Sequence, residues 1–293
     1  MVRARAGLAR ANRNAERRFV VELRGLFAGY HAAVLAAVEA PAKAALAQQR
    51  PIVDAKAPTK PTFPGFPAGH TPPLTSKGQR ATPARTWTKS SFVEASKAVD
   101  DVSRRILPQL APKVSAAHQR LTKDLLASYD RSMRPIMPVG FDKLPSMVQA
   151  QAHVARDESI KYVENAARVY AQQVRAIFDD PEQTQGVRWE DLKADLLDRA
   201  SVSESRAELI ARDQTLKLAG KINMSRQTAN GITHYTWSTS LDERVREEHA
   251  ALEGEVFAWN APPEPGNPGD DFQCRCVAIP EIDGVQWGAV EVE

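Results

Sequence analysis

A proline-rich stretch at residues 51–90 most constrains how this chain can fold. It holds eight prolines and three glycines but few aliphatic residues. Proline lacks a backbone N–H and disfavours both helix interiors and central strands, so such a stretch forms no regular packed element. We expect an extended or flexible linker that separates residues 1–50 from the rest of the chain.

Residues 1–50 are predicted to form a basic amphipathic helix, an N-terminal arm. Alanine is abundant, and apolar residues recur at steps of three and four: Phe19, Leu23, Leu26, Phe27, Tyr30, Val34 and Val38. Six arginines precede this stripe in the sequence: Arg3, Arg5, Arg10, Arg13, Arg17 and Arg18. The apolar face must be buried, either against the same chain or against a partner ring.

Residues 91–200 are predicted to form a helical body. Residues 91–133 read as helical segments interrupted at Pro108 and Pro112. The second half of residues 140–178 holds a stronger helix with a packing seam of Ile160, Val163, Ala167, Tyr170, Val174 and Ile177. A turn at residues 184–187 precedes a short helix over 189–200, with Leu192, Leu196 and Leu197 inward.

Residues 201–293 are predicted to form a small α/β unit, so the fold class is mainly α with a C-terminal α/β part. Ser205 and Glu208 have the capping-box spacing, which opens a helix ending at Asn230-Gly231. Three short strands follow, over residues 232–237, 256–259 and 274–279. Ser240 and Glu243 predict a short helix between the first two strands, and Gly254 ends it.

The only two cysteines, Cys274 and Cys276, are candidate metal ligands. Residues two apart on a strand point to the same side, where the thiols are poorly placed for a disulfide with each other. With His249 they offer three soft ligands for zinc, and the fourth is Asp242, His234, Asp271 or water. Two buried cysteines beside a hydrogen-bonded core histidine, or a redox or catalytic pair, are the alternatives.

Several ordered motifs between residues 140 and 280 resemble the phage Mu F-like family, the minor head or head morphogenesis proteins of tailed bacteriophages. They include Tyr235-Thr-Trp237, Ser240-Leu-Asp242-Glu-Arg244-Val-Arg246-Glu-Glu-His249, Leu252-Glu-Gly254 and Cys274-Arg-Cys276. The helix before them reads Ser205-Arg-Ala-Glu-Leu-Ile-Ala-Arg212, where members commonly continue Arg-Thr-Glu and this chain has Arg212-Asp213-Gln214. Structural motif residues expected from the resemblance are Arg212, Trp237, Asp242, Arg244, Arg246 and Gly254.

The resemblance implies a minor capsid protein that acts in viral head assembly and in DNA packaging or ejection. It implies a low-copy position in the virion at or near the portal vertex, after assembly in the bacterial host cytoplasm. The implied partners are the portal protein, the major capsid or scaffolding protein, and packaged DNA.

Enzyme signatures are sparse in this sequence. It has no Gly-x4-Gly-Lys-Ser/Thr loop, no His-Glu-x-x-His and no Gly-x-Ser-x-Gly elbow. A cysteine with His249 as its base, or a divalent metal held by Asp242, Glu247, Glu248 and His249, are the remaining chemical options. Adjacent helix positions point in different directions, so those four cannot all converge. We therefore expect a non-enzymatic protein.

The charge distribution suggests the alternative function. Residues 1–90 carry fifteen Lys/Arg and four Asp/Glu, a net +11, whereas residues 241–293 carry thirteen acids and three arginines, a net −10. A basic segment of this kind is typical of proteins that bind nucleic acid or acidic surfaces, so DNA binding or processing through the arm is the competing hypothesis. No apolar run approaches the roughly 20 residues of a membrane span, and no membrane partner is expected.

Overall fold

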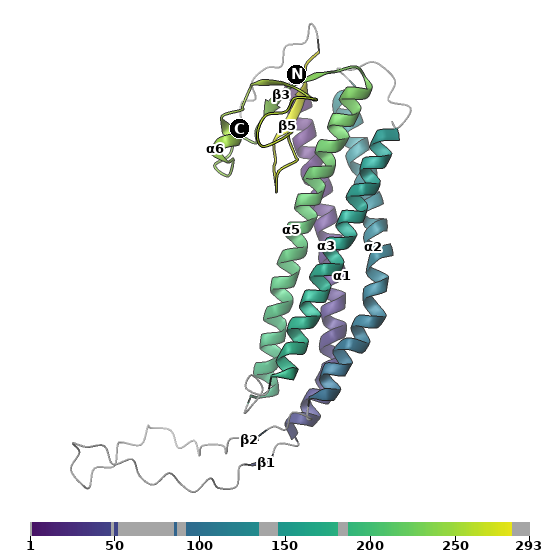
Figure 1. Cartoon of the computed structure of the whole chain (residues 1–293), viewed down its shortest axis with the longest axis vertical. Helices are drawn as coiled ribbons and strands as arrows, with labels where there is room; N and C mark the ends of the chain where they lie inside the picture. The colour runs from purple at the N-terminus through teal and green to yellow at the C-terminus, as the bar shows by residue number, and fades with distance from the viewer. Residues whose placement is uncertain are drawn as a thin grey trace, which may run out of the picture. The chain divides into compact units, whose positions relative to one another are not determined.

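The structure is a computed structural model that describes residues 2–47, 50–51, 85–86, 92–134, 146–180 and 187–282. Most of it is helical, as Figure 1 shows, with four long helices: α1 (Val2–Ala47), α2 (Val93–Met133), α3 (Ser146–Asp179) and α5 (Trp189–Ala229). A small antiparallel sheet lies near the C-terminus, so the predicted fold class is confirmed. The predicted linker lies outside the described residues, apart from a two-residue strand pair, β1 (Arg50–Pro51) and β2 (Arg85–Thr86).

Backbone contacts divide the chain into two compact units. The first unit comprises Met1–His31, Arg104–Tyr170 and Ala200–Glu293, and the second comprises Ala32–Ser103 and Ala171–Arg199. Each long helix contributes residues to both units. The domain boundary predicted at residues 200 and 201 falls inside α5, which runs unbroken through it.

Helix α2 continues through Pro108 and Pro112, so the predicted interruption is wrong. Both prolines lie on the exposed side of the helix, while Leu110 and Val114 are buried. Carbonyl groups that lose their partner next to a proline can be hydrated on an exposed face, and burial of the opposite face keeps the helix continuous.

Helix α5 replaces the two helices predicted over residues 189–200 and 205–229. Ser205 is an interior residue, and its hydroxyl donates to the carbonyl oxygen of Ser201 at 3.1 Å instead of capping a new helix. Leu192 and Leu196 are buried as predicted, but Leu197 is exposed. The C-cap at Gly231 is confirmed, because its φ of 76° is left-handed and its N–H bonds to the carbonyl of Thr228.

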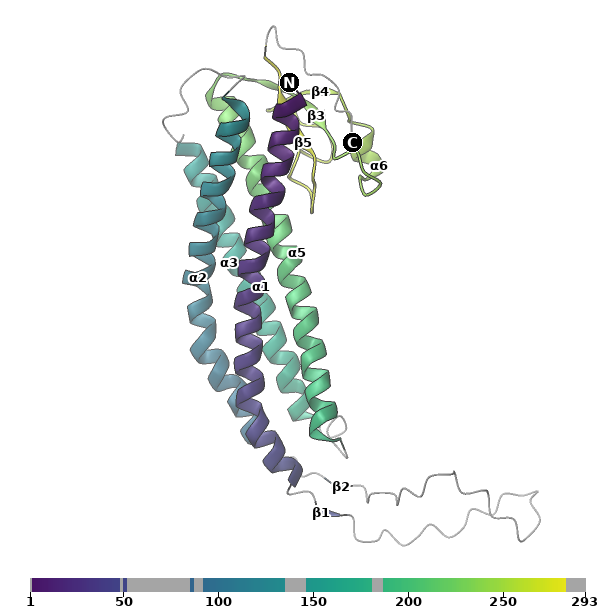
Figure 2. The same ribbon diagram turned by 180° about the vertical axis from the view of Figure 1, so that it is seen from behind.

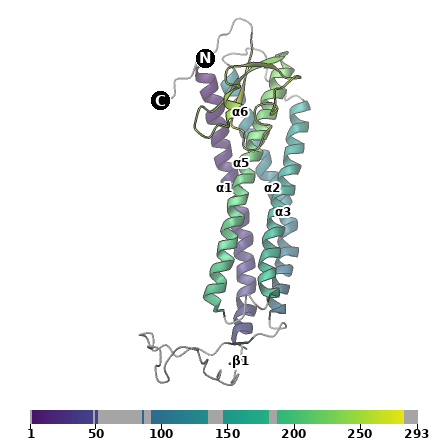
Figure 3. The same ribbon diagram turned by 60° about the vertical axis from the view of Figure 1, so that its left-hand side comes forward.

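In the first unit the apolar stripe of α1 packs on its own chain. Phe19, Leu23, Phe27 and Tyr30 are buried, and the Tyr30 ring meets Tyr170 of α3 with 5.9 Å between centroids. Figure 3 shows this part of α1 beside α5, where Arg212 approaches Glu16 to 3.3 Å. Of the two alternatives for this apolar face, the structure shows packing within the chain.

The segment Arg13–Ala47 is long and apolar enough, by length and composition alone, to cross a membrane. The expectation that no apolar segment reaches this length is corrected to that extent. Core helices of soluble proteins can meet the same criterion, and 33% of the scanned window of this helix is buried inside the structure.

The second unit is also built from parts of the four long helices. The rings of Phe92 and Phe178 pack with 5.6 Å between centroids, and Ser96 donates to Asp179 at 2.6 Å. The ammonium group of Lys43 lies 5.7 Å above the ring of Trp189. The predicted seam of α3 is confirmed in both units, since Val163, Ala167, Tyr170, Val174 and Ile177 are buried and Ile160 is half-buried.

The sheet belongs to the first unit and has the order β4-β3-β5, with all neighbours antiparallel. Its strands are β3 (His234–Ser238), β4 (Val256–Ala258) and β5 (Val277–Pro280), which confirms three predicted strands, although β5 begins after the cysteines. Figure 2 shows the sheet with helix α6 (Glu247–Ala250) at its side. Alternate residues Tyr235 and Trp237 of the central strand are buried, together with Trp259 and Ala278.

His118 of α2 is a buried histidine in the first unit. Its ring meets Phe19 edge-on at 6.0 Å, and its Nε2 has no hydrogen-bond partner among the described residues. Burial lowers the pKa of His118 to about 4; Arg156 lowers it further and Asp157 opposes this. Because the unfolded chain binds this proton near pH 6.5, the free energy of unfolding must fall as the solution is acidified below that value.

We expect the native protein to lose about 1–2 kcal/mol of stability through His118 between pH 7 and pH 5. The variant His118→Leu removes the titrating group, so its stability should fall less over the same interval. Burial also lowers the pKa of His31, which remains in the variant, so some dependence should persist. Denaturant unfolding at both pH values checks this, and equal slopes for the two proteins would refute it.

Candidate functional site

The last turns of α5 hold the sheet through buried amide side chains. Asn223 donates to the carbonyl oxygen of Ala278 in β5 at 2.7 Å, and Gln227 donates to the same oxygen at 3.1 Å. The side-chain amide oxygen of Gln227 accepts the indole N–H of Trp259 at 3.2 Å. These bonds satisfy polar groups that burial would otherwise leave without partners, so they fix how β5 lies on α5.

Backbone segments of α5 and the loop before β5 approach each other closely. A Cβ added at Gly220 would lie 2.6 Å from the carbonyl oxygen of Pro268, so only glycine fits there. Gly269 faces it with a left-handed φ of 96°. Lys221 adds an ion pair to Asp270 at 2.8 Å.

Asp213 of α5 connects this helix to the loop before β5. Its buried carboxylate accepts the backbone N–H of Gln273 at 2.9 Å, directly before Cys274. Gln214 turns instead toward Ser159 of α3, at 3.3 Å. Arg212 pairs with Glu208 and Glu16, so it connects helices and does not reach the sheet.

The structure brings His249, Cys274 and Cys276 together. Nδ1 of His249 lies 3.6 Å from the sulfur of Cys274 and 3.5 Å from that of Cys276. His249 and Cys274 are buried, and Cys276 is half-buried. Residues 274–276 precede β5 and are not a regular strand, yet both thiols still face the histidine.

The ionisation of one thiol affects that of the other. Their mutual hydrogen bond lowers the pKa of Cys274 to about 6, and backbone N–H groups and His249 add to this against the effect of burial. The same bond, together with burial, raises the pKa of Cys276. These contacts favour deprotonation of Cys274 over Cys276, which suits metal binding or nucleophilic chemistry.

A second layer of contacts orients His249. Its Nε2 lies 3.4 Å from Asp271, and Arg246 donates to the same Asp271 oxygen at 2.6 Å and to the Phe272 carbonyl at 2.7 Å. The ring of Trp237 meets the imidazole at 89°, with 5.5 Å between centroids. Glu248 forms a further donor group with His249 and Asp271, but it is exposed.

Asp242 does not join the cluster, contrary to its predicted place in the ligand set. Both of its oxygens are held by the guanidinium of Arg275, with one contact at 2.6 Å. This pairing lowers the pKa of Asp242 to about 2. Arg275 lies between the two cysteines in the sequence, and its side chain faces away from the thiols. Asp242, which pairs with Arg275, is therefore held away from the thiols as well. Arg244 is exposed and approaches Asp242 to 3.7 Å.

The short helix predicted between the first two strands is present but begins later than Ser240 and Glu243 indicated, because Leu241 adopts a left-handed φ of 55°. The chain forms turns until α6, which spans only Glu247–Ala250. Gly254 closes the turn after α6 with a φ of 83°, and its N–H bonds to the carbonyl of Trp237 at 2.9 Å. His234, another candidate ligand, is exposed on β3 and bonds to Thr233.

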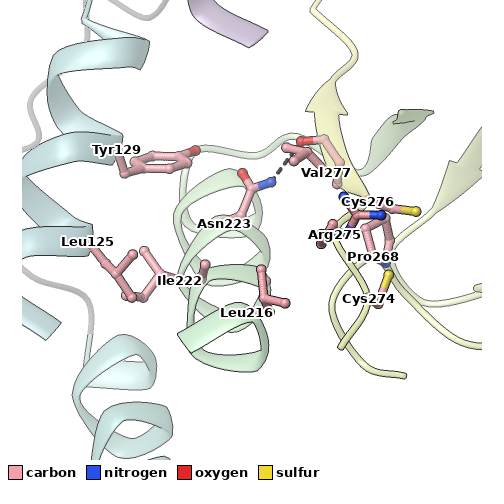
Figure 4. Close-up of a pocket in the computed structure, with 13 residues that line it drawn as sticks. Leu125, Tyr129, Leu216, Ile222, Asn223, Pro268, Cys274, Arg275, Cys276 and Val277 are labelled. Atoms are coloured by element: carbon pink, nitrogen blue, oxygen red, sulfur yellow. Dashed lines mark hydrogen bonds between the residues drawn. The ribbon is translucent and has the colours of Figure 1, made fainter. Parts of the chain in front are cut away.

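A small cavity of about 30 Å³ adjoins the cysteines. Leu125, Tyr129, Ile222 and Asn223 line it from the helices (Figure 4). The sulfur atoms of Cys274 and Cys276 lie on the side of their loop away from α5 in this view. A cavity of this size holds a water molecule and is far smaller than a substrate pocket.

The basic residues of α1 are described only from Arg13 onward as side chains. Arg13, Arg17 and Arg18 are exposed, and Arg18 donates to Asp124 of α2 at 2.9 Å. Arg3, Arg5 and Arg10 lie outside the described side chains. The proposed nucleic-acid or partner contacts of this set stay a prediction.

Sequence reasoning missed Asn223, Gln227 and Gly220 as the residues that hold the sheet. The signal was present, since two amides four apart and a glycine interrupt an otherwise regular helix pattern. Polar residues and glycine within a helix indicate a face that contacts backbone.

We expect Gly220→Ala to destabilise the protein by about 1–3 kcal/mol, because its methyl group would overlap a backbone oxygen that cannot move aside cheaply. Gly25→Ala is the matched control: nothing lies within 4 Å of an added Cβ in that exposed helix position. It should be neutral or stabilising by up to about 1 kcal/mol. Thermal unfolding of both variants checks this, and equal effects would contradict the close approach at Pro268.

Comparison with known proteins locates a family segment in this part of the chain. Residues 183–279 match the profile of a family described as "Phage Mu protein F like protein". An uncharacterized protein of Haemophilus influenzae (strain ATCC 51907 / DSM 11121 / KW20 / Rd) is 48% identical over 94 residues. That stretch is 32% of this chain and covers 21% of the relative.

No solved structure matches this chain. The resemblance noted from residue 140 is thus supported from residue 183 onward. The matched range begins just before α5 and ends within β5, so it contains α5, the sheet and the His249–Cys274–Cys276 cluster. Residues 183–279 are therefore similar to the phage Mu protein F-like family.

Proposed function

We propose that this chain is a head morphogenesis protein of a tailed bacteriophage, a minor capsid component at or near the portal vertex. The observation that carries the proposal is the family match over residues 183–279, a range that includes α5, most of the sheet and the loop before β5. Its proposed partners are the portal protein and the major capsid or scaffolding protein. Its proposed location is the virion, after assembly in the host cytoplasm.

A structural role is favoured over an enzymatic one by the way the motif residues are used. Arg246 holds the loop before β5 by donating to the carbonyl of Phe272, Gly254 closes a turn, and Trp237 packs in the core. Asp242 is engaged by Arg275. These residues hold segments together, and the cavity beside the cysteines has room only for water.

Deleting the coding sequence in the phage or prophage that carries it tests the assembly role. We expect DNA-filled heads and plaque formation to be lost, and both to return when the full chain is supplied in trans. Electron microscopy of lysates and nuclease-protected DNA measure the two effects. Two results together would contradict the proposal: normal yields of infectious particles from the deletion phage, and absence of the chain from purified wild-type heads.

The portal position needs its own measurement. Chemical cross-linking of purified heads, followed by mass spectrometry, should join this chain to the portal protein at low copy. Cross-links to the major capsid protein alone, in a copy number that matches it, would place the chain across the shell and contradict the portal assignment.

DNA binding through the basic segment is the second candidate, favoured by the net +11 of residues 1–90. Binding by exposed arginines such as Arg13 and Arg17 would release counterions, so affinity must fall steeply as salt increases. Fluorescence anisotropy with duplex DNA, comparing the native chain with the Arg13→Gln/Arg17→Gln variant at several salt concentrations, tests this candidate. Binding insensitive to salt and to these substitutions would exclude the segment as an electrostatic DNA site.

A further inference from the structure

We propose that His249, Cys274 and Cys276 bind one zinc ion that fastens the loop before β5 to α6. The three donor atoms come from two segments that are 25 residues apart, and each donor lies within 4.8 Å of the other two. This proposal does not depend on the head-assembly function.

The distances fit a shared cation better than hydrogen bonds alone. Nδ1 of His249 lies almost equally far from both sulfurs, at 3.6 and 3.5 Å. A ring nitrogen has either one proton or one lone pair, so it can satisfy only one thiol at a time. In a tetrahedral site with Zn–S of about 2.3 Å and Zn–N of about 2.0–2.1 Å, a sulfur and a nitrogen ligand are about 3.6 Å apart.

The surrounding contacts have the character of a second coordination shell. The N–H of Gly269 donates to the sulfur of Cys274 at 3.4 Å, which stabilises a thiolate. Asp271 faces the other nitrogen of His249 at 3.4 Å and is itself held by Arg246. A carboxylate behind a metal-binding imidazole fixes the ring orientation and raises its basicity.

The donor set selects the class of metal. Two thiolates and one imidazole are soft ligands that favour zinc and disfavour Mg²⁺ and Ca²⁺, which require oxygen. Two thiolates also neutralise the charge of Zn²⁺, so the ion can be buried without an uncompensated charge. The described residues supply three ligands, and water or a carboxylate would complete the tetrahedron.

A zinc ion at this point would stabilise the attachment of the loop before β5 to α6. Residues 259–276 contain turns and no regular strand or helix, and their attachment to α6 depends on a few side chains such as Arg246. A metal bound by both segments adds its binding free energy to folding. The proposed role of the zinc is therefore structural.

Elemental analysis of the full chain, purified with its thiols reduced from cells supplied with zinc, is the first test. We expect about one zinc per chain, and removal by a strong chelator should lower the melting temperature. A reduced, folded protein with no bound zinc, which also fails to take up added Zn²⁺, would overturn the proposal.

Variants then locate the ion. His249→Gln, Cys274→Ser and Cys276→Ser should each lose zinc, whereas Asp242→Asn should keep it, because Arg275 holds Asp242 away from the cluster. Exposed His234→Gln is a second control. Asp271→Asn should weaken zinc affinity about 10–100-fold without abolishing binding. Zinc retained by His249→Gln, or lost equally in the Asp242 variant, would place the metal elsewhere and refute the site.

Cobalt substitution covers the case in which a cysteine variant fails to fold. The native chain loaded with Co²⁺ should show the intense visible bands of tetrahedral cobalt and a near-ultraviolet thiolate-to-cobalt band. A spectrum typical of octahedral oxygen ligation would contradict the proposal.

Discussion

The carbonyl oxygen of Ala278 accepts hydrogen bonds from both Asn223 and Gln227, and the C-terminal sheet is held on α5 through this point. All three groups are buried, so losing one partner leaves a polar atom without water, which costs about 1–3 kcal/mol. The indole of Trp259 joins the same network through Gln227. Placement of β5 in turn places the cysteines that precede it, and so brings them to His249.

The matched family segment corresponds to this construction. It includes the amides of α5 and the strand that receives them, and it ends within that strand. The helices outside the match complete its core in the first unit, since His31 of α1 lies 3.5 Å from Glu204 and Ser159 of α3 bonds to Gln214. The matched segment thus consists of α5 and the sheet that packs on one side of it. Residues of α1 and α3 contact other positions of α5.

Regular periodicity was the most reliable signal in the sequence. It predicted the stripes of α1 and α3 and the central strand, because alternating or three/four spacing is set by the geometry of the element itself. Local capping patterns failed at Ser205 and at Ser240, where burial of α5 and the left-handed Leu241 overrode them. The same applies to Pro108 and Pro112, which are tolerated because they face outward.

The candidate site was half predictable. The thiols and His249 were expected together, because only a few residue types can form such a cluster. Asp242 was misplaced, since the spacing could not show that Arg275, directed away from the thiols, would capture it. The contacts of Gly220, Asp213 and Asn223 required knowledge of how the loop and strand lie on α5, which depends on pairings 48 to 60 residues apart.

The burial of α1 has a consequence for biosynthesis. Tyr30 packs on Tyr170, and Glu16 faces Arg212, so the helix made first depends on partners made much later. At about 5–20 residues per second, the ribosome needs on the order of ten seconds to add the chain between Tyr30 and Tyr170. During that interval α1 presents an apolar face with the length and composition of a membrane span. The apolar stripe of α1 is therefore buried by α3 and α5 only after both of these helices have been synthesised.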